Sequence, residues 1–106
     1  MMLGGAIAPM NWHDNAMAVP SVKKIDDQIQ ALLKKGKLSD EESLKVNRLR
    51  LEMAQEADRK GVTQFANEEL TRAQAQAEVN PERKELLIEI LKARLDVYKK
   101  LKISNT

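Results

Sequence analysis

The chain has 106 residues, with 18 Lys and Arg against 16 Asp and Glu, which gives a net charge of +2. This length supports one domain with a modest core, and the balanced charge gives no reason by itself to expect a nucleic-acid or membrane partner. The chain has no cysteine, so disulfide bridges and thiolate chemistry are excluded. No apolar run approaches the ~20 residues of a membrane span, and we expect a cytoplasmic protein or a component of a macromolecular assembly.

Helix-forming residues dominate the composition, whereas aromatic side chains are limited to Trp12, Phe65 and Tyr98. The three prolines and four glycines fall almost entirely at expected boundaries between elements. These features predict an all-α fold, a small up-and-down bundle of about four helices preceded by an extended arm. The predicted helices are residues 22–35, 40–60, 64–78 and 81–103, within a single helical domain at 21–106.

Residues 1–20 contain no Lys or Arg and a single acid, Asp14, which is typical of an irregular arm and not of a secretory signal. We expect this arm to be flexible or to become ordered on a partner. Met17 opens the stretch MAVPSVKK, which resembles a translation start, so on one interpretation the first sixteen residues are an extension. Trp12 either anchors the arm in a groove of a partner or folds back onto the end of the bundle.

The first helix, residues 22–35, has Ser21 as its expected N-cap and Gly36 directly after its end. Its polar residues lie opposite a single apolar stripe, as in a conventional amphipathic helix. That stripe consists of Val22, Ile25, Ile29, Leu32 and Leu33.

The second helix, residues 40–60, begins at a capping box formed by Ser39 and Glu42, and Gly61 ends it. The turn GKLSDEE is similar to the turn of short SHOCT-type helical hairpins over these seven residues, and generic helix-stop and helix-start residues explain it equally well. The helix carries two apolar faces, which predicts a position between two neighbouring helices. One face has Val46, Leu49, Met53 and Ala57, and the other has Leu44 and Leu51.

The third helix, residues 64–78, has Thr63 as its expected cap and a thin apolar face. Small side chains allow helices to approach closely but bury little apolar area, at ~25 cal/mol per Å². We therefore expect this helix to be the least firmly held and the most dependent on a partner. Its apolar face consists of Ala66, Leu70, Ala73 and Ala77.

The last helix, residues 81–103, follows an N-cap at Asn80 and has Pro81 at its first position. Its apolar arc covers roughly 220°, against the ~100° that a core-facing helix needs. Either this helix is the centre of the bundle and its own chain covers it on two sides, or part of the arc binds another protein. Arg94 lies inside the arc, where it either sets the register of a coiled coil or extends its guanidinium into water.

We expect a non-enzymatic protein that acts through protein–protein interaction, as a structural subunit or adaptor that self-associates or binds a protein partner. We expect no catalytic residue, cofactor, metal site or small-molecule substrate. His13 is the single histidine and matches no metal-ligand spacing, and adjacent acids such as Glu41 and Glu42 lie about 100° apart on a helix. The expected interface residues are Leu87, Ile90, Leu91, Arg94, Tyr98, Leu101 and Trp12.

A small helical protein that binds nucleic acid through a basic patch is the alternative. The cations gather at helix C-termini, where they also offset the helix dipole. A DNA-reading helix needs polar and basic residues along one exposed face, and Glu52 and Glu56 interrupt that pattern in the second helix. The candidate nucleic-acid contacts are Lys34, Lys35, Lys37, Arg48 and Arg50.

Overall fold

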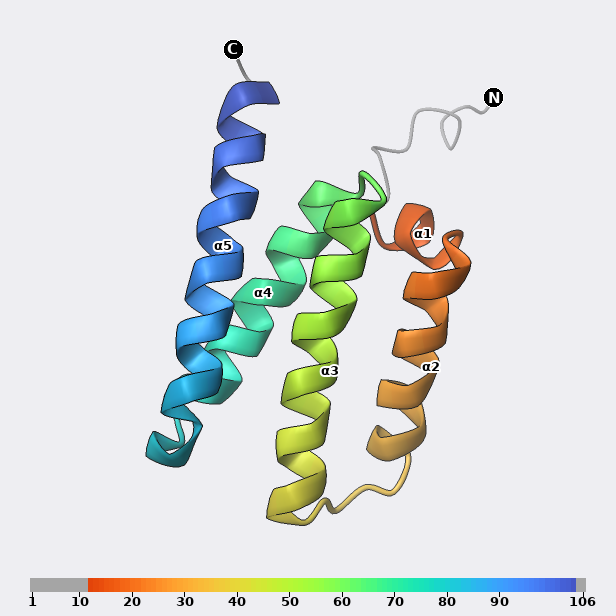
Figure 1. Ribbon diagram of the computed structural model, residues 1–106. Helices are drawn as coiled ribbons and strands as arrows, with labels where there is room; N and C mark the ends of the chain where they lie inside the picture. Colours follow the sequence, from red (N-terminus) through yellow and green to blue (C-terminus); the bar gives the residue numbers. More distant parts are fainter. Residues whose placement is uncertain (1–11, 105–106) are drawn as a thin grey trace, which may run out of the picture.

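The computed structural model describes residues 12–104, with side chains described as far as residue 102. Within this range the chain is helical and contains no strand (Figure 1), so the prediction of an all-α bundle is confirmed. No helix in the described range is long and apolar enough to cross a membrane. The elements are α1 (Trp12–Met17), α2 (Pro20–Leu33), α3 (Asp40–Arg59), α4 (Thr63–Glu78), the 3-10 turn η2 (Pro81–Arg83) and α5 (Lys84–Ser104).

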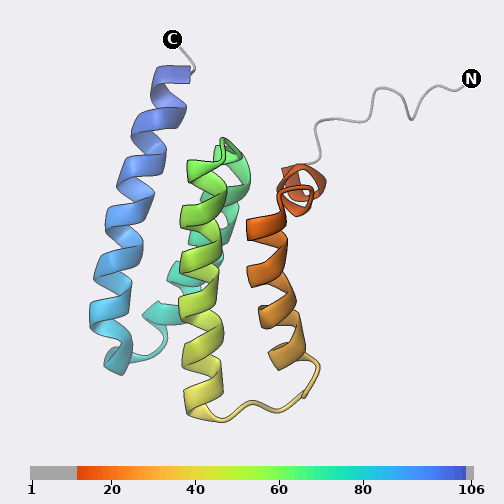
Figure 2. The same cartoon turned by 45° about the vertical axis from the view of Figure 1, so that its right-hand side comes forward.

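The helices from α2 to α5 run alternately down and up and are joined by short connections (Figure 1). Figures 1 and 2 both place α2 and α5 on opposite sides of the molecule, with α3 between them and α4 behind. The helix α3 packs against α2 and α4, and α4 packs against α3 and α5. The helix α5 rests mainly on α4 and makes little contact with α3, so it lies at the edge of the bundle and not at its centre.

The core lies on both sides of α3 and α4. Side chains from both predicted faces of α3 are buried, including Met53 and Leu51, which confirms the prediction that this helix lies between two neighbours. The largest fully buried apolar side chains come from four of the helices: Val22, Ile29, Met53, Leu70, Leu86, Ile90 and Val97.

The position of α4 contradicts the expectation that it is the least firmly held helix. It lies at the centre and contacts α1, α3 and α5. Its small residues Ala66, Ala73 and Ala77 are all buried, and their size lets the neighbouring helices approach closely. Phe65, which the predicted apolar face omits, is also buried. The apolar face of α4 is narrow, but neighbouring helices cover α4 on more than one side.

Two turns follow the sequence closely. Gly36 and Gly61 have φ angles of 82° and 86°, the left-handed conformation that follows helix ends and favours glycine. Ser39 and Glu42 form the predicted capping box: the Ser39 hydroxyl accepts from the Glu42 amide at 3.1 Å, and the Glu42 carboxylate accepts from the Ser39 amide at 3.0 Å. Local side-chain and backbone chemistry therefore specifies the end of α2 and both ends of α3.

Three helix starts differ from the prediction. Val19 is the N-cap of α2 and Pro20 its first residue, so Ser21 lies inside the helix and donates a hydrogen bond to Glu56 of α3. Val62 is the N-cap of α4, while the Thr63 hydroxyl donates to Asp58 at 3.2 Å. Asn80 caps the last segment as predicted, but its first turn is the 3-10 turn η2. In two cases a hydroxyl serves a contact between elements instead of a cap.

The expected arm is partly structured. Residues 1–11 lie outside the described range, whereas Trp12–Met17 form α1, which contacts α2 and α4. Ala16 is fully buried, and His13 lies edge-on to the Phe65 ring, with centroids 6.0 Å apart. Apolar contacts with α2 and α4 order this segment, so the part of the arm from Trp12 onward belongs to the helical domain.

Candidate interaction surface

The helix α5 has two apolar faces with different surroundings. Its inner face packs on the core through Leu86, Ile90, Ala93 and Val97, which are at most 9% exposed. A second row points outward, and we refer to it as the outer row. It consists of Ile88, Leu91, Leu95 and Tyr98, which are 46%, 45%, 57% and 47% exposed.

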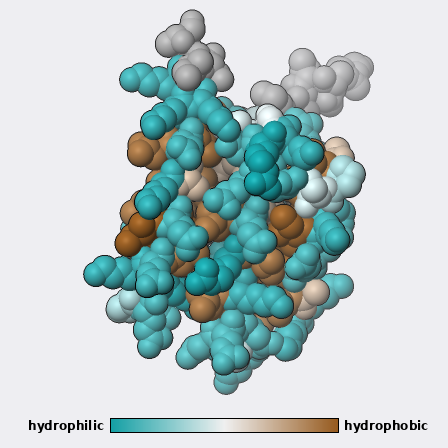
Figure 3. All heavy atoms as spheres, in the orientation of Figure 1, coloured by the Kyte–Doolittle hydropathy of each residue, from teal (hydrophilic) through white to brown (hydrophobic). Residues whose placement is uncertain are grey.

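The outer row follows the spacing i, i+3, i+7, i+10, which places its members in one line along a helix. At 1.5 Å per residue the line is about 15 Å long. Figure 3 shows apolar surface gathered over α5, at the left of the view, between hydrophilic side chains. Single exposed apolar residues are common on proteins, whereas an aligned row of large ones is a candidate contact surface.

A shallow groove runs beside the outer row, between α5 and α4. Leu91, Leu95 and Tyr98 line it together with Arg94 and with Gln74 of α4, and its volume is about 210 Å³. The Arg94 guanidinium donates to Gln74 and to the Tyr98 hydroxyl, and its carbon lies 5.1 Å from the Tyr98 ring centroid. This cation–π contact fixes Tyr98 at one wall of the groove.

The structure separates the residues of α5 that the sequence groups into one interface. Ile90 is fully buried in the core, and Leu87 and Leu101 are partly buried against it. Leu91 and Tyr98 belong to the outer row, and Arg94 flanks it. The other two members of the outer row, Ile88 and Leu95, are absent from the predicted interface.

Trp12 lies against the bundle, as in the second of the two interpretations given for it. It is partly buried, and its indole nitrogen is enclosed without a hydrogen-bond partner. It contributes to a cavity of about 320 Å³ at the turn between α3 and α4, together with Asn15, Gly61, Val62, Thr63, Gln64 and Leu101. Trp12 is therefore not part of the outer row of α5.

The candidate nucleic-acid contacts do not form one free basic patch. Lys35 is paired with Glu42, Arg50 with Glu69 at 3.0 Å, and Arg48 lies 3.9 Å from Glu89 of α5. Lys34 and Lys37 are exposed at the turn after α2. Carboxylates neutralise three of these five cations locally, so their placement does not favour a nucleic-acid surface.

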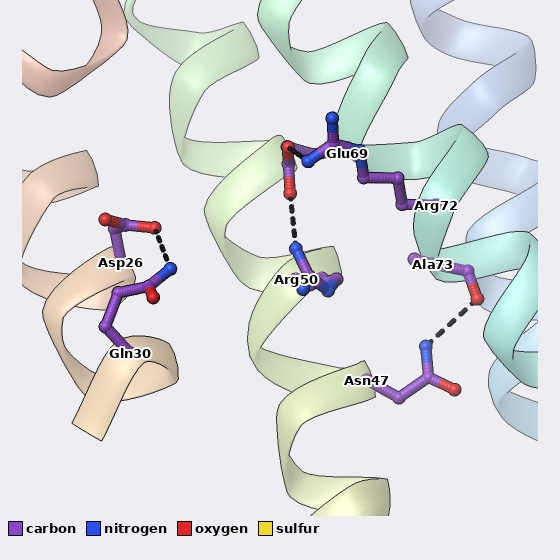
Figure 4. Close-up of polar contacts among 7 residues, drawn as sticks. All are labelled: Asp26, Gln30, Asn47, Arg50, Glu69, Arg72 and Ala73. Atoms are coloured by element: carbon purple, nitrogen blue, oxygen red, sulfur yellow. Dashed lines mark hydrogen bonds and ion pairs between the residues drawn. The ribbon is translucent and has the colours of Figure 1, made fainter. Parts of the chain in front are cut away.

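Buried polar groups tie the helices together in two places. The Asn47 amide, fully buried in α3, donates to the Ala73 carbonyl of α4 at 3.0 Å and accepts from Arg83 at 3.1 Å. Nearby, Glu69 accepts from Arg50 and lies 3.6 Å from Arg72 (Figure 4). These contacts join α3, α4 and the start of the last segment, which is a structural role.

The second of these clusters borders a polar cavity of about 170 Å³ between α1, α2, α3 and α4. His13, Asp26, Gln30 and Phe65 also line it, and Gln30 donates to Asp26 at 3.5 Å within α2 (Figure 4). Among residues 12–104 no group of three or more His, Asp or Glu side chains is placed to hold a metal ion. Among the described residues, the outer row of α5 contains four of the six large apolar side chains that are exposed, the other two being Leu33 and Val79.

Comparisons of the chain with protein-family models, with curated proteins and with solved structures found no match.

Proposed function

We propose that this protein is a non-enzymatic interaction module, a subunit or adaptor of a larger assembly, and that the outer row of α5 is its binding face. The observation that supports this proposal is the half-exposed line of Ile88, Leu91, Leu95 and Tyr98. The inner face of α5 already provides the contacts that hold it to α4. The core therefore does not require the outer row, and its apolar area becomes favourable only when another surface covers it.

The spacing of the row favours a helix as the binding element. Positions i, i+3, i+7 and i+10 are those that contact a facing helix in knobs-into-holes packing. An amphipathic helix placed in an apolar groove is a recurrent mode of peptide recognition, with anchors at this same spacing. The groove beside Gln74 extends the row on the α4 side, so a bound helix would contact both α5 and α4.

A photo-crosslinking experiment in the native cells tests this proposal. A photoreactive phenylalanine analogue replaces Leu95, in the middle of the row, and a matched control carries it at Gln28, which is exposed on α2 on the opposite side of the molecule. We expect discrete protein adducts from position 95, lost when Leu91→Ser and Tyr98→Ser are added, and no such adducts from position 28. The same diffuse labelling from both positions would refute the proposal.

A further inference from the structure

The outer row of α5 is bordered by cations. Lys84 and Lys102 continue the line of the row at its two ends, seven residues before Leu91 and seven after Leu95. Lys92 and Lys99 follow Ile88 and Leu95 at i+4 and so adjoin one side of the row. Arg94 adjoins the other side. We call these five residues the cationic rim.

Cations outnumber acids in the two rows of α5 that adjoin the outer row, where Lys92, Lys99 and Arg94 lie with Glu85. Glu85 lies in the same row of the helix as Lys92 and Lys99, and Glu89 and Asp96 lie one row further from the apolar line, three or four residues from these lysines. Within the described part of the chain, none of the four rim lysines forms an ion pair, and Arg94 is held by the neutral groups of Gln74 and Tyr98.

Cations elsewhere on the protein are paired only in part. In the described part of the chain, carboxylates pair with seven of them: Lys23, Lys35, Arg48, Arg50, Arg59, Arg72 and Lys100. Lysines of the other helices and turns, such as Lys24 and Lys45, form no ion pair within the described residues, but only the cations of the rim border an exposed apolar row. A surface of this kind is complementary to a ligand that is apolar along one line and negatively charged on either side of that line.

We propose that the partner of α5 is an amphipathic helix of another protein with an apolar stripe and acidic flanks. This inference rests on the proposed function and names the chemistry of the partner. Leucine-like side chains of that helix would lie between Ile88, Leu91, Leu95 and Tyr98, and its Glu or Asp residues would approach Lys92, Lys99 and Arg94. The charges would steer the encounter and set the choice of partner, while the apolar contacts would supply most of the affinity.

A second copy of this chain is a poorer partner because its rim carries the same charge. In an antiparallel pair that matches Ile88 with Tyr98 and Leu91 with Leu95, Lys84 of one copy faces Lys102 of the other. A parallel pair brings Lys84 and Lys102 beside their equivalents. Both arrangements place like charges together, which opposes association.

An anionic membrane surface would also attract the rim, but it matches the shape less well. Leu91, Leu95 and Tyr98 are about half exposed and border a groove that Gln74 closes on the other side. Side chains held in this way cannot insert fully below a flat headgroup layer, as the apolar face of an interfacial helix does. A helix can lie along this shallow groove with its side chains between those of the outer row, so the geometry favours a protein helix.

Two designed helical peptides test the charge preference directly. Both have about 21 residues with Leu at every a and d position, one with Glu and the other with Lys at e and g. We expect the full chain to bind the acidic peptide at least about tenfold more tightly than the basic one, measured by fluorescence anisotropy. Raising the salt from about 50 to about 300 mM should weaken binding of the acidic peptide.

Charge reversal on the rim provides the decisive variant. We expect Lys92→Glu with Lys99→Glu to abolish or reverse the preference between the peptides. The matched control, Lys24→Glu with Lys45→Glu, has the same net charge change at exposed positions of α2 and α3 and should keep the preference. Circular dichroism verifies that both variants are folded. Equal affinity for the two peptides, or an unchanged preference in the rim variant, would refute the inference.

Two further measurements test the other possible ligands of the outer row, a second copy of the chain and an anionic membrane. A doubled mass in light scattering behind a sizing column, reduced to one chain by Leu91→Ser with Leu95→Ser, would assign the face to a second copy. Binding to phosphatidylserine vesicles without binding to either peptide would assign it to a membrane. Either result would overturn the acidic-helix inference. The proposed function itself is tested separately by crosslinking, and it fails if position 95 yields no discrete protein adduct that depends on Leu91 and Tyr98.

Discussion

Single residues of this chain often serve contacts between helices where the local pattern suggests a cap. Ser21 precedes an apolar stripe in the manner of an N-cap, yet its hydroxyl donates to Glu56, 35 residues away on α3. This bond and the neighbouring Arg59 lower the pKa of Glu56. Asn47 likewise reads as a surface residue of α3, but it is fully buried and links α3 to α4 and to Arg83. Buried polar groups of this kind make a packing arrangement specific because each requires its partner.

Glu42 gives a prediction about acid stability. Its hydrogen bond with Lys35 and the Ser39 amide lower its pKa from 4.5 to about 2. A carboxylate with a lowered pKa in the folded state stabilises the fold above its unfolded pKa, and this contribution is lost as the pH falls through the folded value. We therefore expect Glu42 to make stability fall with pH between 4.5 and about 2.

Urea unfolding at several pH values measures this dependence. Glu42→Gln should lower the midpoint at neutral pH and flatten the pH dependence in the acid range. Glu41→Gln is the matched control, because it removes the adjacent first-turn acid, which takes no part in the capping box. If the two variants respond identically to acid, the bonds of Glu42 do not stabilise the fold.

At the scale of the elements, α4 shows that a thin apolar face does not imply a loosely held helix. Its buried alanines each cover little area, but they allow α3 and α5 to pack closely on two sides. Leu70 and Phe65 then fill the larger spaces. Each of these contacts buries little area, but α4 makes them with several neighbouring helices, and the dense packing of protein interiors makes their sum substantial.

Ala73→Leu tests the close packing of α4. Ala73 is fully buried and its carbonyl accepts from Asn47 of α3, so a larger side chain has no space there without displacement of a helix. We expect a loss of about 1–3 kcal/mol in the free energy of unfolding, from urea denaturation. The matched control, Ala75→Leu, adds the same atoms at an exposed position of the same helix and should change stability by less than about 0.5 kcal/mol. Equal stability of the two variants would show that the contact is not close.

At the scale of the whole molecule, the decisive feature is that α5 lies at the edge. The helix α4 covers one side of the wide apolar arc of α5, whereas the other side is exposed to water. A central α5 would have buried both sides and removed the need for a partner. The proposed function therefore depends on the arrangement of the helices and not on the composition of α5 alone.

Paired alanine substitutions on α5 test this division of the arc. Ile90→Ala should cost about 2–4 kcal/mol of unfolding free energy, because Ile90 is fully buried. Leu95→Ala, on the outer row, should change the stability of the isolated chain by less than about 0.5 kcal/mol. Thermal or urea unfolding of both variants provides the measurement. A large loss from Leu95→Ala would mean that the outer row is buried within the chain in solution.

The candidate site could be predicted in part. The sequence places an excess of apolar residues on the last helix, and that excess predicts Leu91, Arg94 and Tyr98 as contact residues. The row itself could have been found from the 3-4-3 spacing of Ile88, Leu91, Leu95 and Tyr98. The alternative a/d spacing, through Leu87, Ile90, Arg94, Val97 and Leu101, instead follows the side that packs toward the core.

The sequence alone determined the features that depend on a few neighbouring residues. It specified the all-α class, the capping box at Ser39, the left-handed glycines Gly36 and Gly61, and the approximate extent of the helices from α2 to α5. Only the tertiary structure decided that α4 is central, that α1 belongs to the domain and which side of α5 remains exposed. Helical periodicity reveals where apolar side chains lie around an axis, but contacts between residues far apart in the chain decide which of them are covered.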